Sequence, residues 1–194
     1  MTAPATKPAT RDALVAAATT EFAEHGLDAS LDAICARAGF TRGAFYVHFR
    51  DRDDLMVAVL DRVLLRQQET LLPEGGGDLA STIVRFVAMV AAGEGVTSGT
   101  PAWRIRHTLS ACARVPALRA RYIALQRRAA ARVAATTARG QRDGRVRRDV
   151  DASAIGELLV VLSLGLSAAI DAGIPLDVLA GGAALQKLLA RREP

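Results

Sequence analysis

Three helix starts and a glycine stop are crowded into residues 30–51. Ser30 and Thr41 are each suited to cap the N-terminus of a helix, Gly39 ends the first of these helices, and Asp51 begins a further one. The first helix is therefore barely more than two turns long, and the second is no longer. Two short helices joined by a tight turn at a glycine have the spacing of a helix-turn-helix.

The remainder of the chain is predicted to be helical as well. Hydrophobic residues recur at helical spacing, whereas the alternation of period two that marks a strand is absent. Caps, prolines and glycines divide the pattern into helices expected at 10–25, 52–71, 78–93, 100–107, 116–140 or 144, 151–172 and 175–192. About nine helices result, so the predicted fold class is all-α. We expect a disordered tail at 1–9, a three-helix helix-turn-helix domain at 10–54 and a larger helical domain at 55–194.

Composition argues against several classes of protein. The hydrophobic share of 51% is enough for a sizeable core in 194 residues. Cys35 and Cys112 lie far apart and outside any Cys/His cluster, so we expect free thiols and no metal site. The N-terminus lacks the apolar segment of a signal peptide, and the apolar run at 158–170 is shorter than the roughly 20 residues of a membrane span. A cytoplasmic protein with no membrane contact and no cofactor is expected.

Residues 40–49 hold four of the eight aromatic residues of the chain. At about 100° per residue, Phe45 and Phe49 fall on one face of the second short helix and Gly43 on the opposite face. The phenylalanines are expected to be buried, against Phe22 and Ile34. Gly43 lowers helix propensity by about 1 kcal/mol relative to alanine, which makes sense if a bulky partner must approach the backbone there. Double-stranded DNA is such a partner.

The sequence SLDAICARAGFTRGAFYVHFRDRDDL, residues 30–55, resembles the helix-turn-helix signature of the TetR/AcrR family of bacterial transcriptional repressors. It shares the hydroxyl caps, the Ala-Gly-apolar turn, the glycine and tyrosine of the recognition helix and the acidic-leucine start of the next helix. The match covers about residues 10–60, and beyond it only the number and order of helices agree. The resemblance implies a repressor without enzymatic activity, which binds a palindromic operator as a homodimer and is released by a small hydrophobic inducer.

The resemblance also implies which residues contact DNA. The two hydroxyl caps would bind phosphates through their side chains and backbone N–H groups. Residues 42–44 would face the bases, with the arginine either reading guanine or binding a phosphate. The tyrosine would lie on the sugar-phosphate edge or a thymine methyl group, and the histidine and the last arginine would bind phosphates. The implied contacts are Ser30, Thr41, Arg42, Gly43, Ala44, Tyr46, His48 and Arg52.

The basic excess of the chain lies outside its first third. Residues 1–60 carry six basic and eight acidic side chains, a net charge of −2, whereas residues 61–194 carry nineteen and twelve, a net charge of +7. Few phosphates would therefore be neutralised by the helix-turn-helix domain, which predicts a modest dependence of DNA binding on salt. Arginines recur at 119–148, where a solvated helix face followed by a charged loop and a second nucleic-acid or membrane surface both stay open.

The helix expected at 151–172 is hydrophobic around almost its whole circumference. Together with the apolar positions of the last helix, this favours a four-helix interface between two copies, and a central helix buried within one chain is the alternative. The expected interface residues are Leu158, Leu162, Leu166, Leu185 and Leu188.

The family resemblance places the inducer between the long helices of the larger domain. Plain core packing is the alternative for each candidate and is the one that residue type favours. A mostly apolar cavity with one or two polar anchors would suit a hydrophobic or aromatic molecule. The candidates are Phe86, Met89, Trp103, His107, Cys112 and Tyr122. An all-helical small-molecule-binding protein or enzyme, with a purely structural helix-turn-helix, is the alternative function. The sequence carries neither a phosphate-binding glycine loop nor a nucleophile-base signature that would favour an enzyme.

Overall fold

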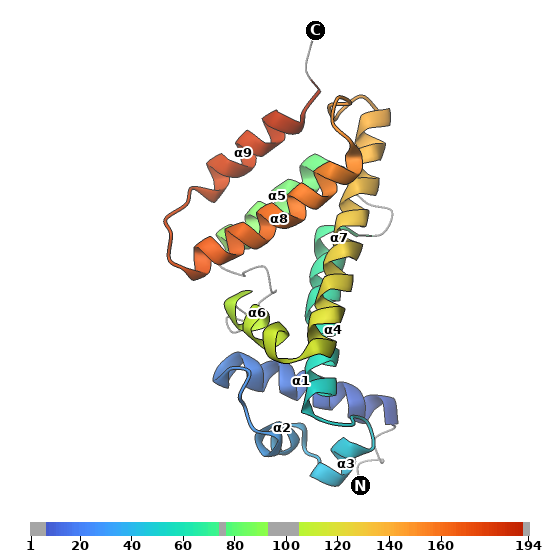
Figure 1. Ribbon diagram of the computed structural model, residues 1–194, viewed down its shortest axis with the longest axis vertical. Coiled ribbons are helices and arrows are strands. Elements are labelled where there is room, and N and C mark those ends of the chain that lie inside the picture. Colours follow the sequence, from blue (N-terminus) through green and yellow to red (C-terminus); the bar gives the residue numbers. More distant parts are fainter. Residues whose placement is uncertain (1–6, 74–76, 93–104, 192–194) are drawn as a thin grey trace.

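The computed structural model describes residues 7–73, 77–92 and 105–191, and these form nine α-helices and no β-strand (Figure 1). The helices are α1 (Lys7–His25), α2 (Leu31–Ala38), α3 (Arg42–Tyr46), α4 (Arg52–Leu71), α5 (Leu79–Ala91), α6 (Ile105–Arg114), α7 (Pro116–Arg142), α8 (Ala152–Asp171) and α9 (Val178–Leu189). Within the described ranges, extended pairing is limited to an isolated bridge between Val146 and Ala190. The predicted all-α class is confirmed.

The helices are arranged along one long axis (Figure 1). The three N-terminal helices lie together at one end, and α4 and the long α7 run from them toward the other end, packed against each other. There α8 packs along α7, and α9 packs on α5. The helix-turn-helix is therefore held at one tip of the molecule, joined to the rest through α4 and α7.

The predicted caps around the short helices are present. The side chain of Ser30 accepts a hydrogen bond from the Ala33 amide at 3.1 Å, and that of Thr41 accepts one from the Ala44 amide at 3.2 Å. Gly39 closes α2 with φ of +73°, in the left-handed region that glycine enters without strain. These bonds satisfy amides that the first turns would otherwise leave unpaired, which is why two such short helices are stable at these positions.

Two helix starts differ from the prediction, and a third cannot be compared. α1 begins at Lys7 and contains Thr10, which is buried inside the helix and does not cap it; proline is tolerated in a first turn, so Pro8 permits the earlier start. α9 begins at Val178, because the side chain of Asp177 caps it by accepting from the Ala180 amide at 2.9 Å. The start expected at Thr100 lies outside the described residues.

One hydrophobic core continues across the predicted domain boundary between residues 54 and 55. Phe22 and Phe45 from the helix-turn-helix end belong to the same buried cluster as Leu60 of α4 and Leu118 and Leu125 of α7. A second, smaller cluster lies among α5, α7 and α8. α4 is therefore shared between the helix-turn-helix and the larger domain, so a change in the packing of one reaches the other.

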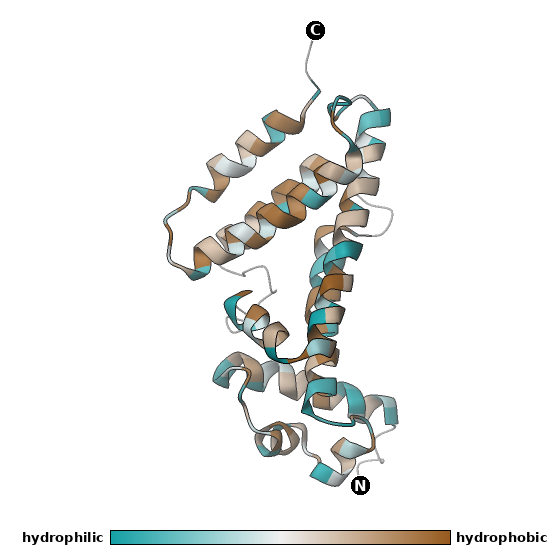
Figure 2. Ribbon diagram, viewed as in Figure 1, coloured by the Kyte–Doolittle hydropathy of each residue, from teal (hydrophilic) through white to brown (hydrophobic). Residues whose placement is uncertain are grey.

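α8 is largely hydrophobic along its length (Figure 2), and it exposes an apolar face that includes Leu158, Val161 and Leu162. It spans 20 residues, so the estimate from the run at 158–170 alone was too short: by length and composition this helix could cross a membrane. Only 17% of its most apolar 18-residue stretch is buried within the chain. Such a face is stable in water only if something covers it.

Candidate DNA-binding surface and ligand cavity

The aromatic residues near α3 hold this short helix in place. Phe45 and Phe49 are buried, with their rings stacked at a centroid distance of 5.4 Å. They share the first core cluster with Phe22 and Ile34, which confirms the predicted packing partners. A five-residue helix has little stability of its own, so these contacts fix its direction.

The opposite side of α3 is open to solvent. Thr41, Arg42 and Gly43 are exposed, and Tyr46 is 58% exposed. The Tyr46 ring contacts the Phe45 ring edge-on at 5.1 Å, which restrains a side chain that otherwise faces water. We call these four residues the α3 face. Of the other predicted contacts, Ala44 and His48 are half-buried beside it.

The two hydroxyl caps keep a free donor. Each hydroxyl oxygen of Ser30 and Thr41 accepts a backbone amide, so its O–H hydrogen remains to donate to an anion. Both side chains are exposed, at the N-termini of α2 and α3. This arrangement suits phosphate oxygens.

Arg42 is held by a partner that the sequence prediction missed. Its Nε and Nη2 atoms donate to the two carboxylate oxygens of Asp32 on α2 at 2.5 and 2.9 Å. Both side chains are more than half exposed, so the pair contributes little to stability. It does hold the planar guanidinium in one orientation at the edge of the α3 face.

Arg52 is placed differently from the other predicted contacts. It is half-buried, and its Nη2 atom donates to the backbone carbonyl oxygens of Leu27 and Ala29. Its guanidinium also lies over the Phe22 ring, 5.3 Å from the centroid. Arg52 therefore braces the loop between α1 and α2 against α4, and we assign it this structural role in place of the phosphate contact.

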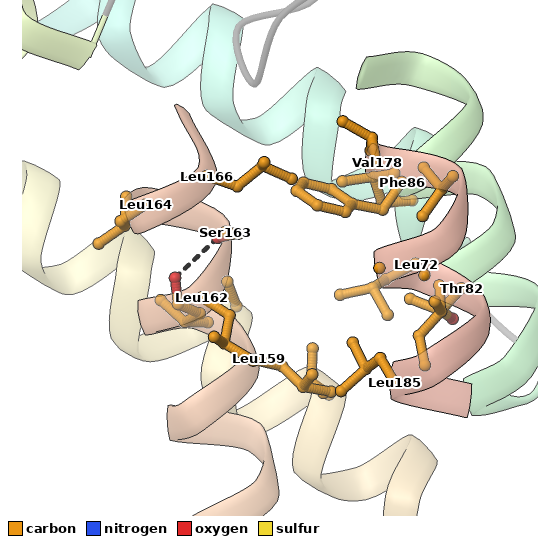
Figure 3. Close-up of a pocket in the computed structure, with 18 of the residues that line it drawn as sticks. Leu72, Thr82, Phe86, Leu159, Leu162, Ser163, Leu164, Leu166, Val178 and Leu185 are labelled. Carbon is orange, nitrogen blue, oxygen red and sulfur yellow. Dashed lines mark hydrogen bonds between the residues drawn. The ribbon is translucent and has the colours of Figure 1, made fainter. Parts of the chain in front are cut away.

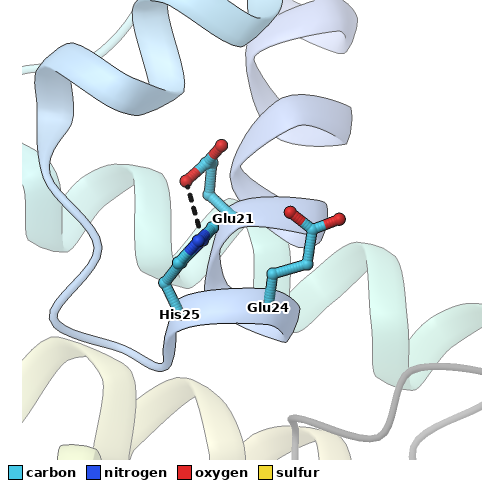
Figure 4. A group of neighbouring side chains, drawn as sticks. All are labelled: Glu21, Glu24 and His25. Atoms are coloured by element: carbon cyan, nitrogen blue, oxygen red, sulfur yellow. Dashed lines mark ion pairs between the residues drawn. The ribbon is translucent and has the colours of Figure 1, made fainter.

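A cluster of Glu21, Glu24 and His25 lies at the end of α1 (Figure 4). Two carboxylates and an imidazole at close range are compatible with a metal ion, but Arg37 of α2 already donates to Glu21 and to Glu24, each at 2.5 Å. His25 pairs with Glu21 at 3.2 Å. The pKa of Arg37 is raised, chiefly by its hydrogen bond to Glu21. The cluster is an ion-pair network that ties α1 to α2.

A cavity of about 470 Å³ opens among α4, α5, α7, α8 and α9 (Figure 3). Its wall is mostly leucine, isoleucine, valine and phenylalanine, with Phe86 beside Val178 and facing Leu166 across the opening. The side toward α4 is formed by buried residues, whereas Leu162 and Leu188 at the α8 and α9 side are exposed. The volume and lining are typical of a site for a small lipophilic molecule.

The predicted ligand residues separate in the structure. Phe86 lines this cavity, but Cys112 and Tyr122 lie in the first core cluster, and Met89 and His107 are half-buried outside the cavity wall. Trp103 lies outside the described residues. Burial raises the pKa of Tyr122 to about 12, so its hydroxyl stays protonated at neutral pH. The predicted interface residues are also divided, between exposed and half-buried positions.

Leu158 and Leu162 are exposed on α8 and Leu188 on α9, whereas Leu166 and Leu185 are half-buried; all except Leu158 line the cavity. The exposed leucines are free to meet another molecule. The half-buried leucines already pack against other residues of the same chain.

The sequence prediction missed the glutamines of the cavity wall. Gln67 and Gln68 on α4 and Gln126 on α7 line the cavity, and the first two are buried. A signal was present in the sequence. The apolar stripe of α4 runs through Val63 and Leu64, and the two glutamines occupy the next positions on the same face, three and four residues after Leu64. A pair of polar residues at core positions is unusual and indicates a candidate binding site.

Several arginines of the 119–148 stretch bind other parts of the chain. Arg121 pairs with Asp61 of α4 at 2.5 Å, and Arg145 pairs with Asp78 at the start of α5 at 3.3 Å. Six of the ten arginines in this stretch make side-chain hydrogen bonds to described residues. Four bond to groups outside the stretch, namely Arg121, Arg132, Arg145 and Arg147, and Arg139 and Arg148 bond within it. The stretch therefore fastens α7 and its following loop to neighbouring elements, in agreement with the helix-face and loop interpretation.

Comparison with known proteins agrees with this arrangement. Residues 14–59 match the family model described as bacterial regulatory proteins, tetR family. The HTH-type transcriptional repressor BepR of Brucella suis is 41% identical over 64 residues, which are 32% of this chain and 31% of BepR. The aligned region thus spans about a third of that relative.

Two solved structures extend the likeness over the whole fold. The reduced form of NemR from E. coli superposes with a TM-score of 0.74 at 18% identity, covering 93% of this chain and 97% of NemR. The complex of SmeT with triclosan superposes with a TM-score of 0.63 at 27% identity, covering 88% of this chain and 84% of SmeT. SmeT is the repressor of a multidrug efflux pump of Stenotrophomonas maltophilia. Both the helix-turn-helix and the helices around the cavity therefore have counterparts in known structures.

Proposed function

Because the chain belongs to the TetR family of bacterial regulatory proteins, we propose that it is a transcriptional repressor, which binds a palindromic operator as a homodimer and is released by a small lipophilic molecule. The α3 face carries this proposal. This short helix buries Phe45 in the core, as does Phe49 just after it, and the α3 face turns a hydroxyl, a guanidinium, an unobstructed glycine backbone and a phenol to solvent. These groups suit the edges and backbone of a DNA major groove.

The two sides of the α3 face have different tasks in DNA binding. Thr41 and Ser30, at the helix N-termini, donate their hydroxyl hydrogens to phosphates and set the register. Arg42 offers its bidentate guanidinium to guanine or to a phosphate, and Gly43 lets the backbone approach, since no side chain stands there. Tyr46 presents its ring and hydroxyl to the sugar-phosphate edge. The net charge of −2 in residues 1–60 favours positioned contacts over a general positive field.

Homodimer formation accounts for the exposed apolar face of α8. Leu158, Val161 and Leu162 are exposed on this helix, and Leu179 and Leu188 are exposed on α9. Two copies packed through these helices would remove the apolar surface from water and set two α3 faces about one DNA turn apart. A membrane is a poorer cover. α7 packs along α8 and carries the exposed Arg127 and Arg128, which insertion of α8 would draw toward hydrocarbon.

Release by a ligand follows from the position of the cavity. Its deep wall is formed by α4, and the same helix packs against α1 and the buried side of the helix-turn-helix. A molecule that favours one placement of α4 therefore changes the separation of the two α3 faces in a dimer. SmeT, a structural neighbour, has been crystallised with triclosan, which supports a small lipophilic molecule as the ligand class.

Selection of bound sequences from random double-stranded DNA tests the proposal. We expect recovery of a palindrome whose half-sites are about one helical turn apart. Arg42→Ala should weaken binding of the recovered site about 5- to 100-fold, as expected for loss of a bidentate contact, and Tyr46→Phe should weaken it less. Both variants must remain folded by circular dichroism. Recovery of no enriched sequence, or variants that bind like the natural chain, would contradict a repressor and leave the helix-turn-helix as a packing motif.

A further inference from the structure

The buried end of the cavity contains amide groups that the fold does not use. Gln67 is only 5% exposed and lines the cavity, yet its side chain makes no hydrogen bond to any described residue. Its amide atoms are not sealed off inside the protein, since they are absent from the fully buried unpaired atoms of the described chain. The amide of Gln67 therefore faces the cavity with one acceptor and two donors available.

Gln68 beside it offers a second acceptor. Its Nε2 atom donates to the carbonyl oxygen of Leu125 on α7 at 2.9 Å, which fixes the orientation of the amide, because the reverse orientation would set two oxygens against each other. The Oε1 atom is left buried without a donor. A buried polar atom without a partner destabilises the protein. A bound molecule that supplies the missing hydrogen bonds therefore gains affinity in addition to that from its apolar contacts.

The charge of the wall restricts the polar group of such an occupant. Among the described residues that line the cavity none is Lys, Arg or His, and the single ionisable one is Asp177. Asp177 is exposed at the α9 end, where its carboxylate caps that helix. An anionic head group would lose its hydration at the buried end without meeting a positive charge. The cavity therefore favours a bound molecule whose polar head group is uncharged.

We propose that this cavity binds an uncharged lipophilic alcohol, whose hydroxyl bonds to the Gln67 amide and whose apolar body fills the space toward Phe86 and Leu185. A hydroxyl fits because it donates and accepts at the same time, matching an amide that offers both kinds of atom. The inference rests on the proposed ligand-responsive function and specifies the chemical class that this site selects.

Titration calorimetry of the full chain in the absence of DNA tests the proposal with three probes of nearly equal size. Nonan-1-ol has an uncharged donor and acceptor, octyl methyl ether has the same number of heavy atoms but no donor, and nonanoate is anionic. We expect nonan-1-ol to bind about 2- to 10-fold more tightly than the ether, in line with one net hydrogen bond, and nonanoate to bind at least tenfold more weakly than the alcohol.

Variants locate the polar contact. Gln67→Leu should bring the affinities of the alcohol and the ether to within about twofold, while the ether keeps its affinity because the apolar wall remains. Gln67→Met repeats the test with an unbranched side chain if the leucine variant does not fold. Thr70→Ala is the control, because Thr70 lies on the same helix but is exposed and bonds to the Arg66 carbonyl, and it should keep the preference for the alcohol.

Three outcomes would overturn the proposal. They are equal affinity for nonan-1-ol and nonanoate, an unchanged preference for the alcohol in Gln67→Leu, and failure of all probes to bind, as expected if the second copy fills the cavity. Operator binding is measured separately on the selected DNA. If nonan-1-ol binds as predicted but DNA is not released, the repressor mechanism fails and the site chemistry stands; if DNA is bound but the probes are not, the converse holds.

Discussion

The pairing of Asp32 with Arg42 places a carboxylate beside the side chain best suited to read DNA. A negative charge at this point repels phosphates, so it weakens binding to every sequence alike. It also competes with phosphates for the guanidinium, because a carboxylate and a phosphate are both bidentate acceptors and exchanging one for the other gains little. Guanine offers such an acceptor in its O6 and N7 atoms. We therefore expect Asp32 to set discrimination between sequences.

Asp32→Ala should tighten binding to random DNA and reduce the ratio of operator affinity to random affinity. With Arg42 released to a phosphate in each subunit, the slope of log affinity against log salt should steepen by about 2 for a dimer, at roughly 0.9 per phosphate. Fluorescence anisotropy over a range of salt concentrations measures both quantities. The stability of the fold should change by less than about 1 kcal/mol, since the pair is exposed.

Asp53→Ala is the matched control for that experiment. Asp53 is an exposed carboxylate in the first turn of α4 and has no ion-pair partner among the described residues. Its removal changes the net charge of the same domain by the same amount without releasing an arginine. If Asp53→Ala lowers discrimination as much as Asp32→Ala does, the effect comes from net charge, and the role assigned to the pair is wrong.

At the scale of elements, the contact of α7 with α8 depends on Gly156. A Cβ atom built at this position would lie 2.5 Å from the Ala130 carbonyl oxygen and 3.0 Å from the Ala134 amide nitrogen. Backbone atoms of a helix cannot rotate away, so Gly156→Ala must push the two helices apart. We expect a loss of about 1–3 kcal/mol in the free energy of unfolding, the range for overpacking of a core, measured by urea denaturation.

Gly182 gives a graded comparison for Gly156. A Cβ there would lie 2.5 Å from the Cγ2 atom of Val87, where α9 meets α5. A valine methyl group can move by a small shift of its side chain, whereas a helix carbonyl cannot, so Gly182→Ala should cost less than Gly156→Ala. A cost for Gly182→Ala equal to or larger than that for Gly156→Ala would show that the α7–α8 contact is looser than the structure indicates.

α5 depends on the cap made by Asp78. Its carboxylate accepts the Ser81 amide at 2.8 Å, and the Ser81 hydroxyl accepts the Asp78 amide in return at 3.1 Å. Hydrogen bonds from Ser81 lower the pKa of Asp78 below its ordinary value. The ionised cap therefore adds stability at pH values above the ordinary pKa of aspartate, near 3.9, and this contribution is lost as the pH falls through the lower pKa of the folded state.

Asp78→Ala should lower the free energy of unfolding at pH 7 by about 1 kcal/mol, the usual effect of losing a cap. The difference between the variant and the natural chain should shrink as the solution is acidified below pH 4, because the natural chain then loses the same interaction. Urea denaturation followed by circular dichroism at several pH values measures this convergence. A difference that stays constant down to pH 2 would mean that ionisation of Asp78 does not stabilise α5.

The elements that could be predicted from sequence are those with local signals. α4 was expected at 52–71 and is found at Arg52–Leu71, because a cap at Asp51 and the break at Pro73 both act within a few residues. The start of α1 was wrong, since Thr10 has the side chain of a cap but is buried by tertiary packing. The local side chains determine which residues could begin a helix, and tertiary packing determines which of these residues does.

The candidate sites show the same limit at longer range. The α3 face follows from the helical period, which separates Phe45 from Tyr46 within one short helix. The pairing of Arg42 with Asp32 and the wall of the cavity join residues from different helices. Their positions depend on the angles between helices, which no local pattern encodes. Cys112 and Tyr122 were reasonable ligand candidates by residue type, but the angles between the helices direct both side chains into the core.

At the scale of the whole molecule, the proposed homodimer connects the apolar face of α8 to the reading of DNA. A single α3 face is expected to make few phosphate contacts, since residues 1–60 carry a net charge of −2. Two faces held at a fixed separation bind one palindrome together, so the second contact is made without a further loss of translational freedom. Operator affinity should therefore fall steeply whenever the dimer dissociates, even if each copy stays folded.

Val161→Glu tests this dependence. Val161 is 63% exposed at the centre of the apolar face of α8, so a glutamate there is tolerated in a single copy but would be buried without a partner in a dimer. We expect sedimentation analysis to show monomers at concentrations where the natural chain is dimeric. Binding of the palindromic operator should fall at least tenfold, while binding of a single half-site is unchanged.

Val84→Glu is the control, because Val84 is 56% exposed on α5, which is not one of the two helices proposed for the interface. It introduces the same charge at a similar exposure, and it should leave both the dimer and operator binding intact. If Val161→Glu remains dimeric, α8 is not the interface, and its exposed face needs another cover. If Val161→Glu is monomeric but binds the palindrome as tightly as before, the two α3 faces act independently, and control of their separation by the cavity is no longer a workable mechanism.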